Sequence, residues 1–198
     1  MPKIVDHDQR RSEIVEAFLT VVARDGLAAA TSRAIAAELG IGTGALWHYF
    51  DGFDEVAAGA YQRITDRTNI RIGRATAGLR GLDAAYAMLR EILPLTKETL
   101  DEAHVVVGFW GRLAANAGLE EKTQTDLGDY WGDLLRGYFA EAVSDGTLDP
   151  AIPVDDVLNV LFTICLGQQV NAVMSSPMVD PTRQLAMIDH CLRPWHLP

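Results

Sequence analysis

The stretch Arg33–Tyr49 carries side chains whose types suit contact with a nucleic acid. Six of its residues are candidates: Arg33, Thr43, Gly44, Trp47, His48 and Tyr49. Thr43 offers a hydroxyl group, and Gly44 has no side chain, which allows close approach to phosphate or base edges. Trp47 has an indole N–H donor and a flat apolar face, and the two aromatic residues after it can donate to phosphate or base. Arg33 is the cation best placed for a phosphate, whereas an isolated Trp47 would be interpreted as a core residue.

The elements that would position these side chains are two short helices joined by a tight turn. Thr31 has the hydroxyl group of a good N-cap for a helix over Ser32–Leu39, which is rich in alanine. Gly40 can adopt the left-handed conformation that ends a helix, and Gly42 is an acceptable N-cap for a second helix over Thr43–Phe50. This is the helix-turn-helix arrangement, whose second helix enters the major groove of DNA.

The same stretch resembles the TetR family of transcriptional regulators. The matching residues run from the N-cap to the end of the second helix: Thr31, Arg33, Ile35, Ala36, Leu39, Gly40, Ile41, Gly44, Ala45, Leu46, Trp47 and Phe50. Gly42 and Trp47 stand where the family usually has a serine and a tyrosine. After Phe50 the family usually has a lysine that grips phosphate, but this chain reads Asp51-Gly52-Phe53-Asp54. The resemblance implies a DNA-binding head and a helical body that senses a ligand and dimerises.

The remaining chain favours helices throughout. Apolar residues at three- and four-residue spacing, with glycine and proline between the runs, predict these further helices: Asp8–Asp25, Phe53–Ala77, Leu82–Leu93, Lys97–Ala117, Glu120–Ser144, Val154–Met174 and Thr182–Arg193. The expected fold is therefore all-α, with nine helices in a TetR-like architecture. The expected domains are a helix-turn-helix DNA-binding domain at 1–52 and a ligand-binding and dimerisation domain at 53–198.

Several side chains in these helices have more than one interpretation. Leu46 and Phe50 are expected in the core of the head. Two arginines at the start of the first helix could reach phosphate or simply be solvated: Arg10 and Arg11. A stripe on the helix after the head could face DNA, acidic helices of the body or solvent: Arg63, Arg67, Arg71 and Arg74. Gly78 and Gly81 are expected to end that helix.

The segment from about Leu93 to Trp195 also resembles the C-terminal domain of the choline-responsive BetI branch of the family. This resemblance implies a ligand-sensing body without identifying the ligand. Six apolar and aromatic side chains are candidates to line a pocket, and for each of them core packing is the alternative: Met88, Phe109, Trp110, Leu113, Tyr130 and Trp131.

The eighth predicted helix, Val154–Met174, is apolar over too much of its circumference for a helix that buries one face. We expect the eighth and ninth helices together to pair with their copies across a two-fold axis, as the four-helix interface of a homodimer. Gly167 would allow close approach of the two helices there.

Charge and composition limit the class of protein. The net charge is −10, but residues 1–52 carry five Lys/Arg against seven Asp/Glu, and residues 81–198 carry seven against seventeen. The acid thus lies mostly away from the helix-turn-helix, which predicts weak non-specific DNA binding without excluding specific binding. Two cysteines without metal-ligand spacing, no signal-peptide pattern and no long apolar run favour a reduced cytoplasmic protein that does not enter a membrane.

No set of residues predicts catalysis or a cofactor. Asp101 and His104 have the spacing that could begin a metal site, but a di-iron bundle needs a second such motif, which the sequence lacks. We therefore expect a regulator without enzymatic activity, most simply a repressor that a small molecule releases from a pseudo-palindromic operator. The alternative is a helical enzyme or ligand carrier that keeps a vestigial DNA-binding head.

Overall fold

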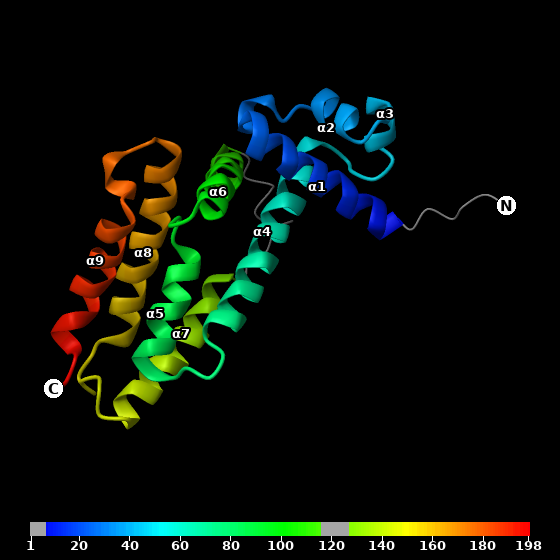
Figure 1. Cartoon of the computed structure of the whole chain (residues 1–198). Coiled ribbons are helices and arrows are strands. Elements are labelled where there is room, and N and C mark those ends of the chain that lie inside the picture. Colours follow the sequence, from blue (N-terminus) through cyan, green and yellow to red (C-terminus); the bar gives the residue numbers. More distant parts are fainter. Residues whose placement is uncertain (1–6, 116–126) are drawn as a thin grey trace. The chain divides into compact units, whose positions relative to one another are not determined.

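The computed structural model describes residues 7–115 and 127–198 (Figure 1). Nine α-helices lie in these residues: α1 (His7–Asp25), α2 (Ser32–Glu38), α3 (Thr43–Leu46), α4 (Phe53–Ala75), α5 (Gly81–Ile92), α6 (Lys97–Ala115), α7 (Leu127–Ser144), α8 (Val154–Val173) and α9 (Pro181–Leu192). Short 3-10 helices accompany them: η1 (Leu27–Ala29), η3 (Pro177–Val179) and η4 (Arg193–Trp195). The all-α prediction is confirmed. The predicted helix end at Ala117 and helix start at Glu120 lie outside the described residues.

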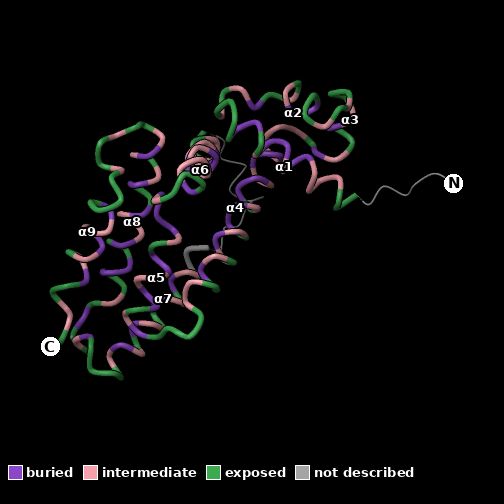
Figure 2. The backbone as a smooth tube through the Cα atoms, in the orientation of Figure 1, coloured by how far each residue is buried: buried purple, intermediate pink, exposed green. Residues whose placement is uncertain are grey.

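The described chain divides into two compact units. Unit 1 comprises residues 7–66 and 101–115, and unit 2 comprises residues 67–100 and 127–198. Each unit has a hydrophobic core of its own, and the buried residues of both are purple in Figure 2. α4 and α6 each contribute residues to both units, because the divisions fall within these two helices.

The helix-turn-helix in unit 1 forms as its sequence predicts. The Thr31 hydroxyl oxygen accepts a hydrogen bond from the Ala34 N–H at 3.2 Å, which confirms Thr31 as the N-cap of α2. Gly40 has a φ of +65°, the left-handed conformation that a residue with a side chain rarely adopts. Gly42 is the N-cap of α3 and has no side chain with which to bond the free N–H groups. Backbone conformation thus sets this turn.

Helix α3 is shorter than predicted, because it ends at Leu46 and not at Phe50. The N–H groups of Tyr49 and Phe50 both bond to the Leu46 carbonyl oxygen, at 3.0 and 3.2 Å. The Tyr49 carbonyl oxygen accepts a hydrogen bond from the Arg11 guanidinium group of α1. This contact joins α1 to the turn that follows α3, and helical periodicity does not predict it.

The prediction that Gly81 ends the helix before it was wrong. α4 ends at Ala75, Gly78 turns the chain with a φ of +77°, and Gly81 is the first residue of α5. The Gly81 N–H donates to a carboxylate oxygen of Glu141 at 2.9 Å, and a Cβ atom at this position would lie 3.4 Å from the Ala142 Cα. That distance is an ordinary contact, but Gly81 has a φ of +56°, a conformation that a residue with a side chain rarely adopts, and this explains why a glycine stands here.

Unit 2 is a helical core held together by large apolar side chains. α5 packs against α7, and α8 packs against both α7 and α9. Phe139 of α7, Leu161 of α8 and Met88 of α5 are fully buried in this core. The chain after α9 bonds to the connector between α7 and α8, since Asp149 N–H donates to the Trp195 carbonyl oxygen at 2.8 Å.

Replacement of Gly40 is expected to separate backbone strain from packing. Neither Gly40 nor Gly44 has an atom within 4 Å of an added Cβ, but only Gly40 has a positive φ. Gly40→Ala should lower the free energy of unfolding by about 1–2 kcal/mol, whereas Gly44→Ala, inside α3, should raise it by up to about 1 kcal/mol. Denaturant unfolding of both variants measures these changes. Two changes of the same sign would contradict this account of the turn.

Candidate functional site

The candidate DNA-contacting residues form an exposed surface on unit 1. Arg33, Thr43, Gly44, Trp47 and His48 are all exposed, and Trp47 is 42% exposed, which is unusual for a tryptophan. By contrast, the side chains of Leu46 and Phe50 are buried, at 0% and 3% exposure, as predicted. The helix-turn-helix therefore presents its polar and small residues outward and uses its apolar residues as an anchor.

Tyr49 differs from the other candidates because it is half-buried. Its ring packs against the His7 ring with centroids 5.1 Å apart. Arg11 donates to the Tyr49 carbonyl oxygen, forms an ion pair with Glu55 at 2.6 Å, and lies over the Phe50 ring at 4.2 Å. The start of α1 thus holds the chain segment that follows α3. The contacts of Arg11 are with residues of unit 1, so its role is structural and not that of a phosphate contact.

The first turn of α4 contains an arrangement that sequence reasoning did not predict. Phe53 stands at the start of α4, and its ring meets the Phe18 ring edge-on, with centroids 5.8 Å apart. The Arg112 guanidinium group of α6 lies 4.9 Å from the centre of the Phe53 ring and 3.0 Å from the Asp54 carboxylate. No local sequence pattern links Arg112 to Asp54, because residues 55–111 separate the two in the chain, among them residues 67–100 of unit 2.

Among the candidate pocket residues, three lie on α6 in unit 1: Phe109, Trp110 and Leu113. Phe109 is 1% exposed, and its ring stacks on the Tyr61 ring with centroids 4.5 Å apart. Burial raises the pKa of Tyr61, and a hydrogen bond with the Trp110 side chain partly offsets this rise. Phe109 also lines a cavity of about 450 Å³, together with Phe18 and Arg112. The lining is only partly apolar because it includes the charged Arg112, and neither Trp110 nor Leu113 lines this cavity.

The other three candidate pocket residues lie in unit 2. Met88 is fully buried in the core, whereas Tyr130 is 51% exposed. Trp131 is half-buried, and its indole N–H donates to the Asn69 side-chain oxygen at 2.8 Å. The six residues therefore belong to two separate groups, one in each unit.

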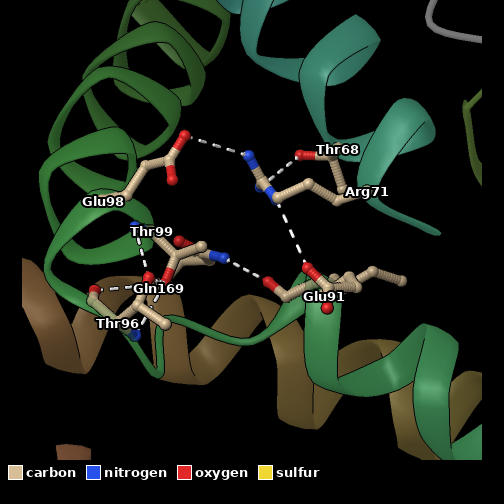
Figure 3. A network of polar contacts seen from close by, with 8 residues as sticks. Thr68, Arg71, Glu91, Thr96, Glu98, Thr99 and Gln169 are labelled. Carbon is tan, nitrogen blue, oxygen red and sulfur yellow. Dashed lines mark hydrogen bonds and ion pairs between the residues drawn. The ribbon is translucent and has the colours of Figure 1, made fainter. Parts of the chain in front are cut away.

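A polar network in unit 2 accounts for one arginine of the predicted basic stripe. Figure 3 shows Arg71 of α4 between Glu91 of α5 and Glu98 of α6, with N–O distances of 3.4 and 3.7 Å. Arg71 also donates to the Thr68 hydroxyl oxygen at 3.0 Å. Of the alternatives for this stripe, the structure therefore favours contact with acidic helices for Arg71. Arg63 in unit 1 likewise forms an ion pair with Glu16 at 3.1 Å.

The described residues offer little for catalytic chemistry. In residues 7–115 and 127–198, no group of three or more His, Cys, Asp or Glu side chains is arranged to hold a metal ion. Burial raises the pKa of the Cys165 thiol to about 12, so this cysteine is no nucleophile at neutral pH. None of the described helices combines the length and the apolar character needed to span a membrane.

Two sequence families match the chain. Bacterial regulatory proteins of the TetR family match residues 14–58, and the C-terminal region of BetI-type transcriptional repressors matches residues 82–194. The HTH-type transcriptional regulator PksA of Bacillus subtilis is 36% identical over 110 residues, which are 55% of this chain and 54% of PksA. The chain thus matches about half the length of that relative. The HTH-type transcriptional repressor KstR2 of Rhodococcus jostii is 26% identical over 148 residues, 74% of this chain and 71% of KstR2.

Solved structures agree with the fold. A putative transcriptional regulator from Saccharomonospora viridis, in complex with choline, superposes with a TM-score of 0.82 over 96% of this chain and 100% of that chain. At 15% identity, this likeness concerns the fold alone. The match over residues 82–194 covers more than half of the sequence. The chain therefore belongs to the TetR family of DNA-binding transcriptional regulators, which are not enzymes, and carries a BetI-type C-terminal region.

Proposed function

We propose that this protein is a homodimeric repressor in the cytoplasm, which a small molecule releases from a pseudo-palindromic operator. Residues 1–52 would bind DNA, and residues 53–198 would bind the effector and form the dimer. The observation that supports this proposal best is the exposed surface of the helix-turn-helix. There, Arg33, Thr43 and His48 present a cation and hydrogen-bond donors to the outside, while Leu46 anchors α3 from within.

The dimer proposal rests on one face of α8. Exposed residues recur there at steps of three and four: Val160, Thr163, Gly167, Val170 and Met174. Val160 is 49% exposed and Met174 is 73% exposed, which is costly for apolar side chains in water. This spacing is the seam of a left-handed helix pair. An added Cβ at Gly167 would have no atom within 4 Å, so a second α8 has room to approach closely.

The effector proposal rests on the aromatic side chains around α6 and α7. We propose that Phe109, Trp110 and Leu113 in unit 1, and Met88, Tyr130 and Trp131 in unit 2, are the residues to test. The relative from Saccharomonospora viridis binds choline, and tryptophan faces attract such quaternary ammonium groups. A choline-like cation is therefore one class of effector to test beside flat apolar molecules. An effector that binds the DNA-incompetent state more tightly lowers operator affinity by that difference.

A binding assay with the promoter DNA upstream of the protein's own gene tests this proposal. The purified chain should shift this DNA at concentrations that leave unrelated DNA free. A compound that alters tryptophan fluorescence should reduce the shifted fraction in parallel. Fluorescence changes without any DNA binding would favour the alternative of a ligand carrier with a vestigial head.

The exposed residues are expected to have different roles: Arg33 should contact phosphate, whereas Thr43 and His48 should contact bases. Arg33→Ala should weaken binding to all DNA sequences and make the slope of log K against log salt shallower by about one unit per head. Thr43→Ala and His48→Ala should instead change the preference among operator variants, by roughly 1–3 kcal/mol where a direct base contact is lost. Titrations at several salt concentrations measure both effects. An unchanged salt slope for Arg33→Ala would remove the phosphate assignment.

A further inference from the structure

The charges of unit 1 are unusual for a surface that binds DNA. Its described residues contain six arginines, no lysine and eleven Asp or Glu residues. Five of the arginines form ion pairs within the unit: Arg10 with Glu13, Arg11 with Glu55, Arg24 with Asp25 and Glu38, Arg63 with Glu16, and Arg112 with Asp54. Carboxylates of the same unit thus already neutralise most of the positive charge that could attract phosphate.

Arg33 is the exception among the described residues of this unit. It lies in the first turn of α2, is exposed, and has no carboxylate within ion-pair distance. Phosphate attraction by the described part of unit 1 therefore falls mainly on Arg33.

Glu55 is the acidic residue most closely connected to the recognition surface. Its carboxylate pairs with Arg11 at 2.6 Å and accepts the Asp51 N–H at 2.6 Å. Arg11 in turn holds the carbonyl oxygen of Tyr49, a candidate DNA contact. The Glu55 side chain is 37% exposed, so this ion pair lies at the surface of unit 1, beside the turn that follows α3.

We infer that Glu55 is a specificity-determining residue, which suppresses non-specific DNA binding by neutralising Arg11, whose positive charge would otherwise attract phosphate beside the recognition surface. Because non-specific binding depends almost wholly on phosphate attraction, neutralising Arg11 lowers the affinity for all DNA sequences. Contacts with base edges do not depend on this phosphate attraction, so they decide which DNA site is occupied. The inference rests on the proposed function, since it concerns how the same surface selects DNA.

Salt dependence gives the inference a quantitative form. Each neutralised phosphate contributes about −0.9 to the slope of log K against log salt, so the two Arg33 side chains of a dimer should together contribute about −2 to the slope. Freeing one further arginine in each head should steepen this slope by about two units per dimer. That change alone corresponds to a roughly tenfold larger loss of affinity between 50 and 200 mM salt.

The test compares Glu55→Gln with the wild-type full chain on operator DNA and on random-sequence DNA. Glutamine retains an oxygen that can accept the Asp51 N–H, so the variant removes charge while keeping the hydrogen bond. Glu38→Gln is the matched control, because it removes the same charge near the end of α1, where Arg24 keeps its ion pair with Asp25, whereas Arg11 lies near the start of that helix. If Glu55→Gln unfolds, Asp54→Asn replaces it as the test variant. Asp54 lies in the same turn of α4 as Glu55, and its replacement removes the ion pair with Arg112 of α6. All chains retain Lys3, whose contribution cancels in the comparison.

Glu55→Gln should bind random DNA about tenfold more tightly at 50 mM salt, with a steeper slope and a smaller ratio of operator to random affinity. Glu38→Gln should change the slope by less than half as much. Unchanged random-DNA affinity and an unchanged slope in Glu55→Gln would overturn the inference while leaving the repressor proposal intact. A wild-type protein that does not prefer its operator to random DNA would instead overturn both.

Discussion

Gly167→Leu is expected to convert the protein into monomers and to weaken operator binding by about a hundredfold or more. The added side chain would occupy the open space over α8 that the proposed partner helix needs. Operator affinity falls with dissociation, because two linked heads bind two half-sites far more tightly than one head binds one. Sedimentation velocity and operator titration measure the two effects on the same sample.

Gly137→Leu is the matched control for this prediction. Gly137 lies on α7, is exposed, and likewise has no atom within 4 Å of an added Cβ. Both substitutions replace a helical glycine with a better helix former, so neither should destabilise the monomer. Gly137→Leu should remain dimeric and bind operator normally. A stable dimer of Gly167→Leu would place the interface on another face.

Phe109→Ala and Trp110→Ala are expected to have opposite consequences, although the two residues are neighbours on α6. Phe109 is 1% exposed and stacks on Tyr61, so its truncation should cost about 3–5 kcal/mol of the free energy of unfolding. Trp110 is only half-buried, so its truncation should lower the free energy of unfolding by less. Because Trp110 is a proposed effector contact, Trp110→Ala should instead raise the effector concentration needed to release operator DNA by about tenfold. This change corresponds to a loss of roughly 1.4 kcal/mol of effector binding free energy.

Thermal unfolding and operator release, measured on both variants, separate these roles. Trp110→Ala should bind operator normally without effector. A Trp110→Ala protein that melts far earlier than the wild type, but whose folded fraction responds to unchanged effector concentrations, would assign Trp110 to packing.

The features that the sequence predicted correctly depend on short-range physical chemistry. The Thr31 cap, the left-handed Gly40 and the buried Leu46 each follow from the conformational preference or hydrophobicity of residues close together in the chain. Helix positions followed from apolar spacing for the same reason, and most helix ends were correct to within one or two residues.

The features that the sequence did not predict depend on partners far apart in the chain. Arg11 of α1 binds the Tyr49 carbonyl oxygen in the turn after α3, and Gly81 opens α5 beside Glu141 of α7. Arg112 reaches Asp54 in the same way. Sequence periodicity identifies which face of a helix is apolar, but it does not state which charged residue on one helix will meet which residue on another.

Selection of DNA from a random pool tests the central claim, that this chain is a dimeric operator-binding regulator, most directly. The full-length protein is mixed with random double-stranded DNA, and the bound fragments are amplified and sequenced over several rounds. We expect enrichment of one inverted repeat, whose two half-sites each accommodate one copy of α3 in the major groove. Failure to enrich any sequence over the starting pool, under conditions in which the protein is folded, would contradict the claim.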